Sequence, residues 1–156
     1  LNHTAGLSTP QQIQMGLFAL MCLLDKKDAY KKSAKKIVRE RYEALFAEAK
    51  HAPLIPLDDK NGAFYYVEID IKRAAIANHS EAFFDWMETN FEPLDFLLRL
   101  AEQSSVVVMP GGGFDDAPWS LRVSLANLDK EDYTEITRQG KLILEDYYAE
   151  YLEATK

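Results

Sequence analysis

One arginine lies inside an otherwise apolar stretch of the chain, Arg122 in the run Leu121–Leu125. A guanidinium at a half-buried position needs an anionic partner, because an unpaired charge there is costly. Two interpretations follow from the pattern. Arg122 could lie on the exposed face of a strand, paired with a surface acid, or it could be a fork on a rigid strand that binds a carboxylate through two parallel hydrogen bonds.

The histidines and the cysteine indicate no second site. His3, His51 and His79 lie far apart and lack the spacing of zinc ligands, so we expect no metal site. Cys22 has large apolar neighbours and is predicted to be a buried, unreactive thiol, with a reactive thiol as the alternative. One cysteine also excludes a disulfide framework within the chain.

Two pairs of acidic residues and a run of glycines are more typical of turns than of catalytic sites. The acid pairs at 58–59 and 115–116 lie near glycine or proline, which favours turns over general acid catalysis. The three glycines at 111–113 are not followed by the Gly-Lys-Ser/Thr of a phosphate-binding loop. We interpret them as a flexible turn that lets the backbone approach something closely.

Composition excludes several classes of function. The 156 residues suffice for one domain, or for one domain and part of another. With 18 lysines and arginines against 25 aspartates and glutamates, the net charge is −7, so we expect no nucleic-acid partner. The longest apolar run covers 16–24, whereas about 20 residues are needed to cross a bilayer, so we expect no membrane partner. We expect a cytoplasmic protein.

Two helices are predicted at the start of the chain. The first begins at Pro10 and runs to about 24, with Thr9 as its N-cap and Gln12 at the capping-box position. Its second half is apolar on nearly every side, which predicts burial on more than one side, in part against structure absent from this chain. The second covers about 28–49, and we interpret its many lysines and arginines as a solvated face, with a binding patch as the alternative.

The remainder predicts a small sheet with helices around it. Residues 51–61 are a linker that contains prolines, and alternation over 63–71 predicts a strand. Further strands are predicted over 105–109 and 121–125, and helices over 80–89, 92–103 and 130–154. The inward positions of the 92–103 helix are predicted to be Leu94, Leu97, Leu98 and Ala101. This order is typical of an α+β domain, a small sheet covered by long helices.

The segment from 106 to 126 resembles the C-terminal signature of class I aminotransferases, which are fold type I enzymes that depend on pyridoxal phosphate. It reads Val-Val-Val-Met-Pro-Gly-Gly-Gly-Phe at 106–114 and Trp-Ser-Leu-Arg-Val-Ser-Leu-Ala at 119–126. In that family a strand ends in Pro-Gly, a loop follows, and a Leu-Arg-hydrophobic-Ser strand supplies the arginine that holds the substrate α-carboxylate. The resemblance therefore implies that Arg122 binds the substrate.

Two further segments extend the resemblance. Gly62 and Phe64 match the start of the family's small domain and are expected near the site. The segment 2–12, Asn-His-Thr-Ala-Gly-Leu-Ser-Thr-Pro-Gln-Gln, resembles aspartate-decarboxylating members of the family. Its Thr4 and Ser8 are expected to approach the site of a neighbouring subunit, with helix capping by Ser8 or Thr9 as the alternative.

The resemblance also implies a division of the chain. The chain begins with Leu1 rather than Met, so we expect a piece of a longer protein. Residues 1–28 would end the large, cofactor-binding domain, 29–50 would form an interdomain helix, and 51–156 would be the small C-terminal domain. The implied partners are an amino-acid or 2-oxo-acid substrate, the large domain, and further copies of the protein in a dimer-based homo-oligomer.

The implied cofactor, pyridoxal 5'-phosphate, withdraws electrons from the α-carbon of a bound amino acid. The implied reaction converts L-aspartate to L-alanine and carbon dioxide, with aspartate aminotransferase as a side activity. The family's cofactor-binding lysine, usually in a Ser-Lys context, has no counterpart, since Ser-Ala-Lys-Lys at 33–36 lies on the predicted linking helix. We therefore expect this chain alone to be inactive, with no catalytic residue and no identified cofactor-binding residue of its own.

Two other functions stay open on the sequence. The chain could belong to another class I aminotransferase that acts on alanine or a different amino acid. It could also be a non-catalytic α+β interaction module that uses the same fold.

Overall fold

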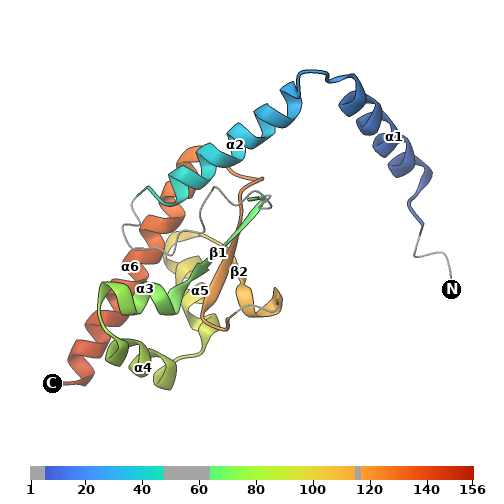
Figure 1. Ribbon diagram of the computed structural model, residues 1–156. Coiled ribbons are helices and arrows are strands. Elements are labelled where there is room, and N and C mark those ends of the chain that lie inside the picture. Colours follow the sequence, from blue (N-terminus) through green and yellow to red (C-terminus); the bar gives the residue numbers. More distant parts are fainter. Residues whose placement is uncertain (1–5, 48–63, 115–116) are drawn as a thin grey trace. The chain divides into compact units, whose positions relative to one another are not determined.

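A computed structural model describes residues 6–47, 64–114 and 117–156 (Figure 1). The chain divides into two compact units, one up to Ile37 and one from Val38 onward. The first unit holds helix α1 (Thr9–Leu24) and the start of helix α2 (Ala29–Leu45). The second holds the end of α2, three strands and the remaining helices, and each unit is described by itself.

Helix α1 begins one residue earlier than predicted, with Ser8 rather than Thr9 as its N-cap. The backbone N–H and the hydroxyl of Ser8 both donate to Gln11 Oε1, at 2.9 Å. Gln12, which was predicted at the capping-box position, donates instead to the backbone carbonyl of Leu7 at 2.7 Å. The glutamine three residues after the N-cap is the one that can reach back, so the cap is set by Ser8 and Gln11.

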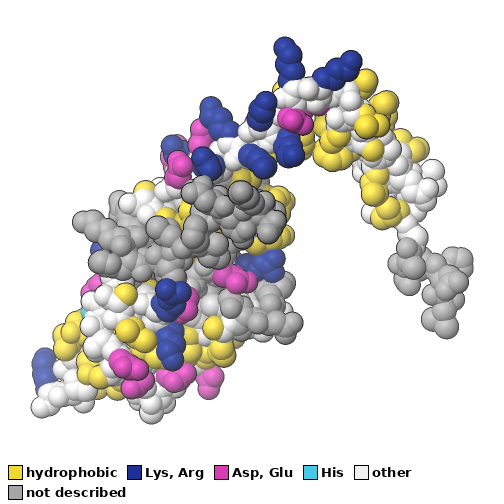
Figure 2. Space-filling model, in the orientation of Figure 1, with side chains coloured by type: hydrophobic (Ala, Val, Ile, Leu, Met, Phe, Trp, Pro, Cys, Tyr) yellow, Lys and Arg dark blue, Asp and Glu magenta, His cyan; other side chains and the backbone are white. Residues whose placement is uncertain are grey.

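The apolar surface of α1 is exposed within its unit, so any burial of this surface would need structure outside this unit. None of its residues is buried, and Cys22 is exposed rather than buried. A helix buries its apolar sides only where another element covers them. Within this unit the ring of Phe18 meets the ring of Tyr30 of α2, with centroids 5.7 Å apart. Figure 2 shows hydrophobic side chains along this helix. The large exposed ones are Ile13, Met15, Leu17, Phe18, Leu20, Met21, Leu23 and Leu24.

A carboxylate caps the start of α2. Asp25 accepts hydrogen bonds from the backbone N–H groups of Ala29 at 2.9 Å and Tyr30 at 2.8 Å, and these bonds lower the pKa of Asp25. Helix α2 ends at Leu45, earlier than the predicted 49. Most of its lysines and arginines are exposed, which fits both the predicted solvated face and the alternative of a binding patch (Figure 2). The predicted linker at 51–61 lies outside the described residues.

The sheet has three antiparallel strands in the order β1-β3-β2. Strand β1 covers Tyr66–Asp70, β2 covers Met109–Pro110 and β3 covers Ser120–Ser124. The predicted strand at 105–109 is thus reduced to a two-residue pairing at its end. The glycines that follow form a short 3-10 helix, Gly111–Phe114, and no described glycine has a positive φ.

One helix of the sheet unit was not predicted. Strand β1 stops at Asp70, and α3 (Ile71–Asn78) follows without a loop. The Asp70 side chain accepts a hydrogen bond from Arg73 N at 2.9 Å, which satisfies one of the free N–H groups of the new helix. The predicted strand at 63–71 therefore includes the first residue of a helix.

The other three helices of this unit match their predicted bounds to within one residue. Helix α4 covers Glu81–Asn90 with Ser80 as its cap, since Phe83 N donates to Ser80 Oγ at 3.2 Å. Helix α5 covers Pro93–Ser104, and α6 covers Lys130–Ala154 as predicted. Capping residues and helical spacing are local signals, which is why these bounds could be predicted.

The inward face of α5 differs from the prediction. The buried residues of α5 are Phe96, Leu97 and Leu100. Leu97 was predicted correctly, but Leu94 and Leu98 are about half exposed. The ring of Phe96 stacks on Tyr147 of α6, with centroids 6.0 Å apart. Packing Phe96 against Tyr147 buries more apolar area than packing Leu94 and Leu98 would. The face of α5 that carries Phe96 is therefore the one that meets α6.

The core lies between one face of the sheet and the helices (Figure 1). From the sheet it takes Val67, Leu121 and Val123, and from α6 it takes Tyr133, Ile136, Ile143, Leu144 and Tyr147. This confirms the α+β class, with a small sheet covered by helices. No helix among the described residues is long and apolar enough to cross a membrane.

Candidate substrate-binding site

Strand β3 places Arg122 on the face of the sheet that lies away from the core. Leu121 and Val123 on either side of it are buried at 4% exposure each, while Arg122 is half-buried. Successive side chains on a strand point to opposite faces, so this pattern sets the direction of the guanidinium. Arg122 thus stands on the middle strand of the sheet, with β1 on one side and β2 on the other.

The register of the strands brings two residues of β1 to the same face as Arg122. Glu68 is its direct cross-strand partner, and Tyr66 lies diagonally from it, opposite Ser124. The Cζ atom of Arg122 lies 4.0 Å from the centroid of the Tyr66 ring, which is cation–π contact. Tyr66 was not predicted near Arg122, because pairing between distant strands has no local signal.

Hydrogen bonds to α6, to α2 and to the residue before β1 hold the end of the strand that carries Arg122. Tyr133 Oη of α6 donates to the carbonyl of Ser124 at 2.8 Å. Arg41 Nη1 of α2 donates to the carbonyl of Leu125 at 2.9 Å, and Leu125 N donates to the carbonyl of Tyr65 at 2.8 Å. A site built on a strand fixed in this way is more precise than one on a free loop.

The structure leaves the prediction untested for most of the other site residues. Thr4 and Gly62 lie outside it. Ser8 caps α1, which supports the capping interpretation, and belongs to the first unit. Phe64 has a positive φ of 52°, and its ring meets Tyr42 of α2 with centroids 6.0 Å apart. Phe64 therefore packs partly inward, two residues before Tyr66.

The chemistry that this arrangement supports is recognition of an anion. Arginine presents its donors in a planar fork that matches a carboxylate, and Arg122 holds that fork on a rigid strand. Among the described residues, no group of three or more His, Cys, Asp or Glu side chains could hold a metal ion. The Arg122 guanidinium is the anion-binding group that the sheet offers.

Comparison with known proteins identifies the class. The family described as aminotransferase class I and II matches residues 3–139, which is most of the chain. This chain belongs to that family. It is also similar to the bifunctional aspartate aminotransferase and L-aspartate beta-decarboxylase of Pseudomonas sp, with 40% identity over 151 residues. The match covers 97% of this chain but 28% of that protein, so the chain spans little more than a quarter of its relative. The predicted family, and the likeness to its aspartate-decarboxylating members, are confirmed.

Proposed function

We propose that Arg122 binds the α-carboxylate of an amino-acid substrate in an enzyme of this family. The observation that supports the proposal most directly is the place of Arg122. It lies on the middle strand, faces away from the core and belongs to the family's Leu-Arg-hydrophobic-Ser pattern. A guanidinium held in this way can form two parallel charge-assisted hydrogen bonds with one carboxylate.

The proposed reaction of the full-length enzyme converts L-aspartate to L-alanine and carbon dioxide, with aspartate aminotransferase as a side activity. The name of the Pseudomonas relative supports this substrate and both activities. Arg122 would hold the α-carboxylate, so that this group stays while the distal carboxylate leaves. Orientation of this kind can supply several kcal/mol of a barrier reduction.

The family generally uses pyridoxal 5'-phosphate, which when bound would withdraw electrons from the substrate's α-carbon. The described residues fit the substrate's carboxylate better than they fit the cofactor. Arg122 offers the anion fork, whereas the chain's nearest counterpart of the family's Ser-Lys motif, Ser-Ala-Lys-Lys at 33–36, lies on helix α2. We therefore assign the cofactor's lysine and phosphate ligands to parts of the enzyme beyond this chain, and propose that the chain alone is inactive.

The proposed domain assignment follows the family's organisation. Residues 1–28 would end the large domain, 29–50 would be the interdomain helix and 51–156 the small C-terminal domain of a fold type I enzyme. The division of the chain within α2, between Ile37 and Val38, supports an interdomain role for this helix. We further propose a dimer-based homo-oligomer in the cytoplasm, with Thr4, Ser8, Gly62 and Phe64 near the site.

The test is Arg122→Lys in the full-length enzyme, with Arg39→Lys on the exposed part of α2 as the control. An ammonium cannot reproduce the fork, so we expect the KM for L-aspartate to rise about ten- to hundredfold in the first variant and to stay unchanged in the second. An unchanged KM in Arg122→Lys would remove Arg122 from the site. Release of carbon dioxide from L-aspartate distinguishes the decarboxylase from a plain aminotransferase.

A further inference from the structure

The ring of Tyr66 covers the flat face of the Arg122 guanidinium, with 4.0 Å between Cζ and the ring centroid. All the N–H donors of a guanidinium lie in its plane, so a ring on its face leaves the donors on its edge able to bind a carboxylate. We propose that Tyr66 is a positioning residue, which holds the plane of Arg122 so that its edge can receive the substrate's α-carboxylate. This inference rests on the proposed function of Arg122.

The surroundings of Tyr66 favour this role over a role in the core. Its side chain is 51% exposed, whereas its strand neighbour Val67 is 4% exposed and belongs to the core. The aromatic contacts described for Tyr66 are the Arg122 guanidinium and the ring of Tyr65. Replacing its side chain should therefore change the site more than the stability of the fold.

Glu68 gives a reason why Arg122 needs restraint. It is the direct cross-strand partner of Arg122 in the register of β1 and β3, so its side chain leaves the sheet on the same face as the guanidinium. A flexible arginine side chain has several rotamers, and a nearby anion favours those that point toward it. A ring stacked on one face limits the rotamers and keeps the plane in one orientation.

Tyr65 provides a matched control. Its side chain is 47% exposed, close to the value for Tyr66, and its ring meets the Tyr66 ring at 5.0 Å between centroids. It lies one residue earlier, and the bond that its carbonyl accepts from Leu125 N is independent of its side chain. Tyr65→Leu thus removes an equally exposed ring from the same region without removing the ring that stacks on Arg122.

The experiment measures kcat and KM for L-aspartate in the full-length enzyme with Tyr66→Leu, Tyr66→Phe and Tyr65→Leu. We expect Tyr66→Leu to raise KM about two- to fivefold with kcat nearly unchanged, which is the size of one exposed cation–π contact. Tyr66→Phe keeps the ring and should keep the wild-type KM, and Tyr65→Leu should leave it unchanged. Tyr66→Met serves the same purpose if the leucine variant does not fold.

A second arm places Tyr66→Leu in an Arg122→Gln background, which removes the cation that the ring contacts. If Tyr66 acts through Arg122, the Tyr66→Leu change should cause no further rise in KM there, which a purely structural role would not predict. The proposal is overturned if Tyr66→Leu behaves like Tyr65→Leu, if Tyr66→Phe is as impaired as Tyr66→Leu, or if the effect persists in the glutamine background. If Arg122→Lys itself leaves KM unchanged, the proposed function fails first, and the role of Tyr66 falls with it.

Discussion

The hydroxyl of Tyr133, in the first turn of α6, donates a hydrogen bond to the carbonyl of Ser124, the last residue of β3, at 2.8 Å. The same oxygen accepts a hydrogen bond from Leu128 N at 3.3 Å. Tyr133 is fully buried, so both bonds are shielded from water. The longest described helix thereby fixes the strand end that lies two residues from Arg122.

Tyr133→Phe should lower the free energy of unfolding by about 1–3 kcal/mol. The variant keeps the ring but leaves the Ser124 carbonyl without this donor, and an unsatisfied buried group bears its full desolvation cost. Urea unfolding of the variant measures the loss. Tyr30→Phe is the control, because the Tyr30 side chain is 52% exposed. Equal stability of the two variants would show that the Tyr133 hydroxyl contributes nothing to the fold.

Tyr147→Phe should have the opposite effect and raise the free energy of unfolding by about 1 kcal/mol at pH 7. The hydroxyl of Tyr147 is buried and has no hydrogen-bond partner among the described residues. The phenylalanine ring can still stack on Phe96 and contact the Arg99 guanidinium, which lies 3.9 Å from the ring centroid. A fall in stability in urea would show that the hydroxyl is satisfied after all.

Tyr147 also predicts a pH dependence at the alkaline end. Burial raises the pKa of Tyr147 from 10.0 to about 12. The folded state then holds this proton more tightly than the unfolded state, so its contribution is complete below pH 10 and is lost as the pH rises to about 12. The free energy of unfolding should be measured for wild type and Tyr147→Phe from pH 8 to 12. The difference between the two proteins should stay constant up to about pH 10 and change between pH 10 and about 12.

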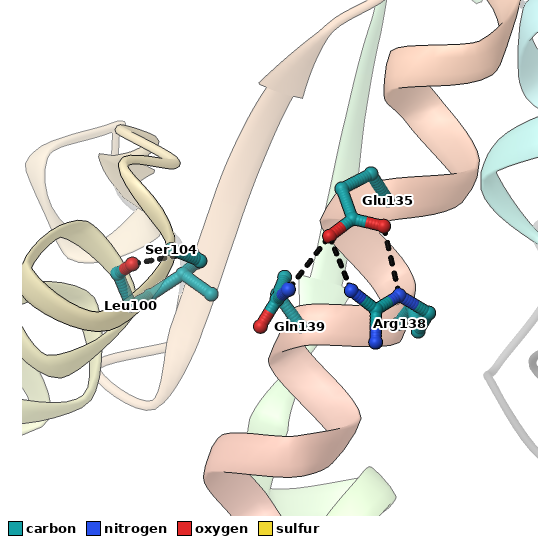
Figure 3. A network of polar contacts seen from close by, with 5 residues as sticks. All are labelled: Leu100, Ser104, Glu135, Arg138 and Gln139. Carbon is teal, nitrogen blue, oxygen red and sulfur yellow. Dashed lines mark hydrogen bonds and ion pairs between the residues drawn. The ribbon is translucent and has the colours of Figure 1, made fainter.

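Glu135 predicts a pH dependence at the acidic end. Figure 3 shows its carboxylate bonded to Arg138 and Gln139 on the same helix, at 2.6–2.8 Å. These bonds lower the pKa of Glu135 from 4.5 to about 2. Its stabilising contribution is therefore present above pH 4.5 and is lost as the pH falls toward 2. Thermal unfolding of Glu135→Gln should lack this part of the acid dependence, and an acid profile identical to wild type would contradict the assignment.

Arg99 joins α5 to α6 through two kinds of contact. Its guanidinium forms a two-point ion pair with Glu150 and lies over the ring of Tyr147. Arg99→Lys should lower the free energy of unfolding by about 1 kcal/mol, because an ammonium loses both the fork and the stacking. A double-mutant cycle with Glu150→Gln should give a coupling of about 0.5–1 kcal/mol that falls in 1 M salt. A coupling that salt leaves unchanged would assign the loss to stacking alone.

The sequence alone determined the bounds of those helices that are marked by a capping residue or by the spacing of apolar residues. Ser80 marked the start of α4, and apolar spacing marked α6 over Lys130–Ala154. It also placed Arg122 on a strand between two inward residues, because alternation is a property of neighbours in the chain.

The tertiary structure decided which residues meet. It made Asp70, the last residue of β1, also the cap of α3, left Cys22 exposed, and brought Tyr66 onto Arg122. None of these follows from nearest neighbours, because each depends on which distant segment pairs with or covers a residue. Local capping and periodicity act within a few residues, whereas the register of β1 against β3 joins parts of the chain on either side of three helices.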